Sequence, residues 1–242
     1  MDEERTARSG AGGGASVLPE ALALDFDGTI VDTETPWYRA WQAVYAGFGA
    51  ALPAEEWART VGTAGDAFDP VAYLEARVGR PLDRAALQGD FRARGLALQA
   101  RQKLRPGVRA LLEEARGLDL PVALASSSPR PWIQGYLERF DLLRFFRTIC
   151  TAEDVRQVKP APDLYRLAVR RLGVAASRTV ALEDSPHGAA AALAAGVPCV
   201  VVPNAFTRVL RFPEGATVLP TLRGRGLEAL AQAAFGRGPS RR

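Results

Sequence analysis

The pattern of hydrophobic and polar positions changes twice along the chain. A short apolar run, "ALALD" at 21–25, predicts a buried strand. Between 36 and 103 the apolar positions recur at helical spacing, and no stretch there has a strong strand pattern. Helices are therefore expected at 36–49, 53–60, 69–79 and 83–104, with Gly89 and Gly95 weakening the last one, and a polar loop is expected at 61–69.

From 105 onward, strands alternate with helices. Strand patterns occur at 121–128, 147–151, 178–184 and 197–202, and helical patterns at 109–118, 129–140, 162–173, 188–196 and 225–235. This alternation predicts an α/β fold with a doubly wound parallel sheet and right-handed crossovers. The all-helical segment interrupts the sheet after its first strand. We therefore expect a core domain at 20–35 and 104–236, an inserted α-helical cap domain at 36–103, and flexible tails at 1–19 and 237–242.

Composition narrows the possible partners. Hydrophobic residues make up 48% and charged residues 24% of the chain, which allows a sizeable core. The net charge is +4, but the arginines are interleaved with Asp and Glu, so we expect a solvated surface and no nucleic-acid partner. No apolar run reaches a membrane-spanning length and no signal segment is visible, so we expect a cytoplasmic protein without a membrane partner. We also expect the protein to be a monomer. Cys150 and Cys199 are interpreted as buried, reduced thiols.

Polar residues follow three of the predicted strands. In parallel sheets, ligands bind beyond the carboxyl ends of the strands, so these side chains are expected to meet in one crevice. They are Asp25 and Asp27 after the first strand, Ser126, Ser127 and Ser128 after the next, and Glu183 and Asp184 after a later one, with Lys159 in a loop before a helix. Four carboxylates lie within ten positions: Asp25, Asp27, Asp32 and Glu34. Their negative charges repel one another, and a bound cation would offset this repulsion.

This set of residue types suits phosphoryl transfer. Carboxylates can hold Mg²⁺, which prefers oxygen ligands, and a phosphate would complete its coordination. A hydroxyl with free backbone N–H groups can grip phosphate oxygens, and a lysine can neutralise charge on the transferring group. One Asp can act as a nucleophile, and the Asp two positions further on can act as a general acid. The expected partner is a small-molecule phosphate ester, and the expected cofactor is Mg²⁺.

The same motifs, in the same order, resemble the haloacid dehalogenase superfamily. The stretches "DGTIVDTE", "LASSS", "VKPAPDLY" and "LEDSPHGAAAALAAG" are similar to its phosphatase and phosphoglucomutase subfamily with a helical cap, over about residues 20–205. The resemblance implies that Asp25 is the nucleophile and a metal ligand, and that Asp27 is the general acid/base and a metal ligand through its backbone carbonyl. It implies that Ser126 and Lys159 are phosphate ligands, with Ser127 beside them. It also implies that Asp184 is a metal ligand and that Glu183 binds the metal directly or through water. Dehalogenating members typically lack the second Asp, so Asp27 favours phosphate chemistry.

These residues also have interpretations other than phosphoryl transfer. A lone D-x-D-G is most often a turn, and Ser127 and Ser128 suit backbone or packing roles. An EF-hand is excluded by Thr29 and Ile30, and no Walker A loop is present. A Ser-His-Asp triad would need His187, yet the chain has no G-x-S-x-G elbow, so His187 is expected in a first helical turn without direct catalytic work. Asp32 and Glu34 are expected to cap the first cap helix or to shape the hinge.

Three functions follow for comparison. The first is a Mg²⁺-dependent phosphatase that acts on a small metabolite, such as a sugar phosphate, through an aspartyl-phosphate. The second is a phosphomutase of the β-phosphoglucomutase type; in that pattern a His stands twelve positions after the nucleophile, where this chain has Trp37. The third is a catalytically idle binding module, which the intact motifs disfavour. Substrate contacts are expected from the cap loop at 61–69.

Overall fold

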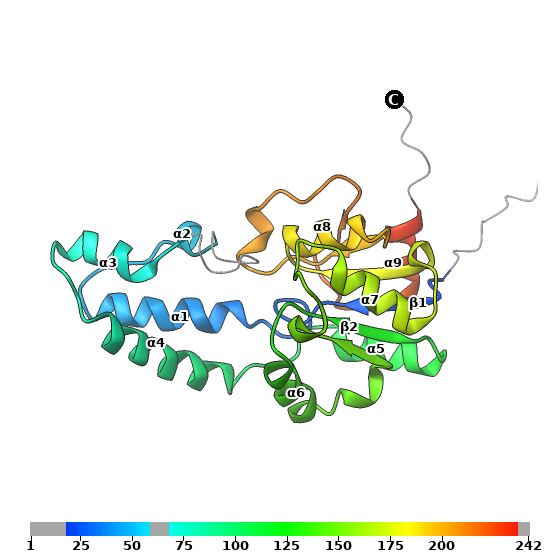
Figure 1. Cartoon of the computed structure of the whole chain (residues 1–242), viewed down its shortest axis with the longest axis horizontal. Helices are drawn as coiled ribbons and strands as arrows, with labels where there is room; N and C mark the ends of the chain where they lie inside the picture. The colour runs from blue at the N-terminus through cyan, green and yellow to red at the C-terminus, as the bar shows by residue number, and fades with distance from the viewer. Residues whose placement is uncertain (1–17, 59–67, 237–242) are drawn as a thin grey trace, which may run out of the picture.

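Parallel strands form the centre of the computed structural model, which describes residues 18–58 and 68–236 of the chain (Figure 1). All strand pairs run parallel, and the order across the sheet is β3-β2-β1-β4-β5-β6. The strands are β1 (Ala21–Leu24), β2 (Val122–Ala125), β3 (Thr148–Cys150), β4 (Thr179–Glu183), β5 (Cys199–Val201) and β6 (Thr217–Val218). The predicted doubly wound parallel sheet is confirmed.

Helices cover both faces of this sheet. On β1, Leu22 and Leu24 point into one apolar cluster, and Ala21 and Ala23 point into another. The first cluster lies under α5 (Val108–Gly117), α6 (Arg130–Arg139) and α9 (Leu227–Phe235), and the second lies under α7 (Asp163–Leu172) and α8 (Pro186–Ala194). A strand buried on both faces has apolar residues at every position, which explains the unbroken run "ALAL".

The first four helices after β1 form a separate layer beside the sheet (Figure 1). They are α1 (Glu34–Ala46), α2 (Ala54–Ala58), α3 (Pro70–Val78) and α4 (Arg84–Gln99). Their apolar side chains pack into a third cluster, built around Trp41, Tyr45 and Leu74, which Phe206 joins from the segment after β5. This is the segment for which we predicted a cap, whose boundaries stay a prediction. Most of the loop predicted at 61–69 and nearly all of both predicted tails lie outside the described residues.

Two details differ from the expected elements. The short strand β6 has no counterpart in the sequence pattern, because two residues are too few to show a period. Helix α4 runs unbroken through Gly89 and Gly95, although glycine disfavours helix. At Gly95 the reason is space: a Cβ placed there would lie 2.0 Å from Cζ3 of Trp37. The glycine lets the indole of α1 lie directly on the backbone of α4.

Neither cysteine is in a disulfide. Cys150 and Cys199 are both buried, so the prediction of buried thiols is confirmed. Among the described residues, no helix combines the length and the apolar character needed to cross a lipid bilayer.

The two glycines of α4 make a matched pair for a test of this packing. Gly95→Ala should destabilise the protein by about 1–3 kcal/mol, because the new methyl group collides with the Trp37 ring. Gly89→Ala meets nothing within 4 Å and should stabilise the helix by up to about 1 kcal/mol. Urea unfolding of both variants measures the difference. If the two substitutions change the free energy of unfolding equally, the expected collision with the Trp37 ring at position 95 does not occur.

Candidate active site

Strand register explains why residues far apart in the chain meet. Leu24 of β1 pairs with Leu182 of β4, so the residues that follow, Asp25 and Glu183, emerge side by side. The backbone N–H of Asp25 continues the ladder by donating to the Leu182 carbonyl at 3.0 Å. On the other side, Leu24 pairs with Leu124 of β2, so Ser126 follows two residues later at the same edge of the sheet. The predicted crevice at the carboxyl ends of the strands is present.

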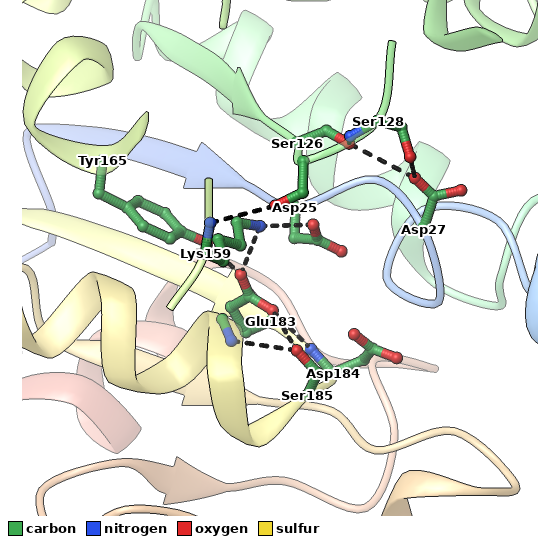
Figure 2. Close-up of polar contacts among 11 residues, drawn as sticks. Asp25, Asp27, Ser126, Ser128, Lys159, Tyr165, Glu183, Asp184 and Ser185 are labelled. Carbon is green, nitrogen blue, oxygen red and sulfur yellow. Dashed lines mark hydrogen bonds and ion pairs between the residues drawn. The ribbon is translucent and has the colours of Figure 1, made fainter. Parts of the chain in front are cut away.

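A buried ammonium joins the two acidic strand ends (Figure 2). Nζ of Lys159 lies 2.5 Å from Oδ1 of Asp25 and 2.7 Å from Oε1 of Glu183. Burial opposes the charged form of Lys159, but the negative charges of Asp25 and Glu183 outweigh it and raise its pKa above the ordinary value. Tyr165 of α7 donates its hydroxyl to the same Glu183 oxygen at 2.5 Å. Sequence reasoning missed Tyr165, whose position in a helical apolar pattern marks it only as a core residue.

The acidic residues have the donor set of a divalent cation site. One carboxylate oxygen from each of Asp25, Glu183 and Asp184 lies within 4.8 Å of the others, and all three residues are buried. Oδ2 of Asp25 is buried and has no hydrogen-bond partner among the described residues. Burial, together with the charges of Asp25 and Glu183, raises the pKa of Asp184 well above its ordinary value. A hard cation such as Mg²⁺ prefers carboxylate oxygens and would offset the charge that raises this pKa, so the three residues fit such an ion.

Glycines allow the backbone to approach these carboxylates closely. Gly28 has a φ of +84°, and a Cβ there would lie 2.0 Å from Oδ2 of Asp184. A Cβ on Gly188 in α8 would lie 2.0 Å from Oε2 of Glu183. Any other residue at either position would push a carboxylate out of the cluster. This accounts for the glycine of "DGT" and for the glycine five positions after Glu183.

Neighbouring loops brace the same edge of the sheet. Nδ2 of Asn204, after β5, donates to Oδ2 of Asp184 at 2.6 Å. The guanidinium of Arg105 donates to the backbone carbonyls of Gly28, of Val202 at 2.8 Å and of Pro203 at 2.9 Å. Arg105 therefore ties the loop after β1 to the loop after β5, and its charge acts on Asp184. Sequence reasoning missed Arg105 and Asn204, because neither belongs to a recognisable motif.

The carboxylate of Asp27 lies apart from the clustered carboxylates of Asp25, Glu183 and Asp184. It sits beside Ser128, and Lys159 lies beside Asp25 instead (Figure 2). Ser128 donates its hydroxyl to Oδ2 of Asp27 at 2.6 Å, and the hydroxyl of Ser126 lies 3.4 Å from the same oxygen. Burial and the charge of Asp25 raise the pKa of Asp27. The interpretation of Ser128 as only a backbone or packing residue is incomplete, since its side chain contacts Asp27 directly.

A cavity of about 490 Å³ opens over these groups. Its walls include Ser127, a predicted phosphate ligand, and His187, for which no direct catalytic role is predicted. The Ser127 hydroxyl accepts a hydrogen bond from the backbone N–H of Lys159 at 3.3 Å. His187 lies in the first turn of α8, as expected. The roles assigned to the predicted site residues stay predictions. All of these residues except Glu183 line this cavity, and Glu183 is buried beside Lys159.

Asp32 and Glu34 have different surroundings. Asp32 accepts from the backbone N–H of Thr35 at 3.0 Å and from its hydroxyl at 2.7 Å, which satisfies one N–H in the first turn of α1, although the N-cap residue itself is Thr33. Glu34, the first residue of α1, lines the cavity beside Trp37. Burial, with the charges of Asp27 and Asp32, raises the pKa of Glu34 to about 8. A carboxyl group that is largely protonated at neutral pH therefore stands in the cavity wall.

Comparison with known proteins gives consistent relatives. The profile of the family described as haloacid dehalogenase-like hydrolase matches residues 22–202. The chain is 43% identical to the protein YhcW of Bacillus subtilis (strain 168), over 81% of this chain and 88% of that protein. It is 30% identical to a phosphorylated carbohydrates phosphatase of Thermotoga maritima, over 74% and 82% of the two chains. The crystal structure of CbbY from Rhodobacter sphaeroides with xylulose-(1,5)bisphosphate superposes with a TM-score of 0.67 at 31% identity, covering 88% and 99%.

The raised pKa of Glu34 predicts a pH dependence of stability. In the unfolded chain this carboxyl has a pKa near 4.5, against about 8 in the folded protein. Its favourable contribution is therefore complete below pH 4.5 and is lost as the pH rises towards 8. Glu34→Gln should avoid this loss, so the melting temperature of the variant relative to wild type should rise by about 2 °C or more between pH 5 and pH 9.

Differential scanning calorimetry at a series of pH values makes this measurement. Glu113→Gln on the exposed face of α5 controls for the removal of one carboxylate. A difference between Glu34→Gln and wild type that stays constant with pH, or falls as the pH rises, would contradict the prediction.

Proposed function

The chain belongs to the haloacid dehalogenase-like hydrolases and is a phosphoric monoester hydrolase, and we propose that it cleaves a sugar phosphate with Mg²⁺ through an aspartyl-phosphate on Asp25. The observation that carries this proposal is the buried Oδ2 of Asp25. This oxygen has no hydrogen-bond partner among the described residues, while Lys159 holds the other oxygen of the same carboxylate. A nucleophile needs a free lone pair, and the ion pair with Lys159 fixes the position of the carboxylate.

In the first step, Oδ2 of Asp25 attacks the phosphorus, and the bond from phosphorus to the leaving oxygen breaks. Asp27 gives its proton to that oxygen, so the sugar departs as an alcohol. Ser126 and Lys159 hold the oxygens of the transferring group, with Ser127 beside them. Asp25, Asp184 and the backbone carbonyl of Asp27 would hold the cation, with Glu183 bound directly or through water. When bound, Mg²⁺ supplies positive charge that offsets the carboxylates and the phosphate.

In the second step, water hydrolyses the aspartyl-phosphate. Asp27, now ionised, accepts a proton from the water as its oxygen bonds to phosphorus. The bond between phosphorus and Oδ2 of Asp25 breaks, which regenerates the carboxylate and releases inorganic phosphate. The raised pKa of Asp27 suits a group that must hold a proton in the first step and accept one in the second.

The names of the relatives support a sugar phosphate as substrate. One relative is named a phosphorylated carbohydrates phosphatase, and another carries xylulose bisphosphate in its crystal structure. The mutase alternative has less support, because Trp37 occupies the hinge position where that pattern has a His, and an indole N–H only donates. The binding-module alternative would predict a lost catalytic position, and none is lost. A cytoplasmic monomer remains part of the proposal.

Substitution of the nucleophile tests the chemistry. Asp25→Asn should lower kcat by at least about 10³-fold, because an amide does not attack phosphorus. Phosphate release from p-nitrophenyl phosphate with Mg²⁺ gives the rate, and circular dichroism verifies the fold. Asp90→Asn on the surface of α4 is the matched control and should leave the rate unchanged. Turnover of Asp25→Asn near the wild-type rate would refute the assignment.

The fate of the phosphoryl group separates hydrolase from mutase. ³¹P NMR of the enzyme with Mg²⁺ and glucose 1-phosphate or glucose 6-phosphate should show inorganic phosphate growing as substrate disappears. No interconversion of the isomers is expected on that timescale, with or without a bisphosphate primer. Both signals should stay constant in EDTA, because the carboxylate cluster then lacks its cation. Isomer exchange that outruns phosphate release would favour the mutase.

A further inference from the structure

One indole contacts the proposed acid/base group, and no sequence motif points to it. Nε1 of Trp132 donates to Oδ1 of Asp27 at 2.9 Å. Ser128 donates to the other oxygen, so both oxygens of the Asp27 carboxylate are held by the segment that follows β2. Trp132 is the third residue of α6 and lines the catalytic cavity. The side chain therefore faces the site and is not buried in the core.

Trp132 is itself held from two sides. Its ring packs edge-on against Tyr136, one turn further along α6, with centroids 5.1 Å apart. On the other side it stacks with Trp37 of α1, with centroids 6.4 Å apart and planes at 25°. Trp37 lies in turn on the backbone at Gly95. The indole nitrogen is thus a fixed donor, held in position by Tyr136 of α6 and Trp37 of α1.

We infer that Trp132 is a positioning residue for the reaction: its N–H orients the Asp27 carboxyl group for proton transfer to and from the substrate oxygen. The inference rests on the proposed role of Asp27 as general acid/base. An indole N–H can only donate, so Oδ1 stays an acceptor and Oδ2 is the oxygen that exchanges the proton. Oδ2 faces the hydroxyl of Ser128, which can either donate or accept and so tolerates both states of Asp27.

Leaving groups of different acidity separate this role from simple packing. A weakly acidic leaving group needs a proton as its bond to phosphorus breaks, whereas p-nitrophenolate leaves without one. The probes are p-nitrophenyl phosphate and phenyl phosphate, whose rings have nearly the same shape. Trp132→Phe keeps an aromatic ring and removes the N–H. We expect its kcat/KM to fall about 10-fold or more on phenyl phosphate and less than about 3-fold on p-nitrophenyl phosphate, mainly through kcat.

Tyr136→Phe is the matched control. It removes one hydroxyl donor from the same helix, but that hydroxyl is bonded to Oε1 of Gln99 at 2.7 Å and not to Asp27. Its effect on the two probes should be equal. If Trp132→Phe does not fold, Trp132→Leu is measured in the same series. Equal losses on both probes, or no loss, would overturn the inference.

Asp27→Asn distinguishes this result from a failure of the proposed function. It should show the same dependence on the leaving group, with a larger loss, and Trp132→Phe should add little in that background because the two residues act together. If Asp27→Asn affects both probes equally, the acid/base role of Asp27 is wrong. If Asp27→Asn discriminates and Trp132→Phe does not, the positioning role of Trp132 is wrong.

Discussion

The ion pair of Lys159 with Asp25 and Glu183 is the interaction on which the site depends. It places an ammonium between the ends of β1 and β4, where burial makes uncompensated charge costly. One lysine does not balance three clustered carboxylates, and the excess negative charge favours a bound cation. The hydroxyl of Tyr165 and the space left by Gly188 keep Glu183 where the lysine can reach it, and Gly28 leaves space for Asp184.

The two aspartates of the first motif receive different environments although they are two positions apart. Asp25 continues the sheet ladder and forms an ion pair with the ammonium of Lys159. Asp27 lies past the end of the strand and is surrounded by neutral donors, which hold its orientation while burial and Asp25 raise its pKa. The difference in charge around the two groups separates a nucleophile from an acid/base, as pairs of carboxylates in other active sites are separated.

Aromatic packing links the helical layer to this chemistry. Trp37 of α1 lies between Gly95 of α4 and Trp132 of α6, so the position of the first cap helix affects the donor to Asp27. Glu34, one turn before Trp37, brings a further carboxyl group into the same cavity. The helices that we expect to select the substrate are therefore in contact with residues that serve the reaction.

The sequence by itself determined the sheet, most of the helices and the candidates Asp25, Asp27, Ser126, Lys159, Glu183 and Asp184. Periodicity marks elements locally, and catalytic motifs place their residues at fixed short spacings after strands. Only the tertiary structure decided which further side chains hold that set in place. Trp132 and Asp27 are 105 positions apart, and Arg105 lies 97 positions from the Val202 carbonyl that it binds. Such partners have no local signal, because each is an ordinary helix or loop residue until the crossovers of the sheet bring it to the edge where the strands end.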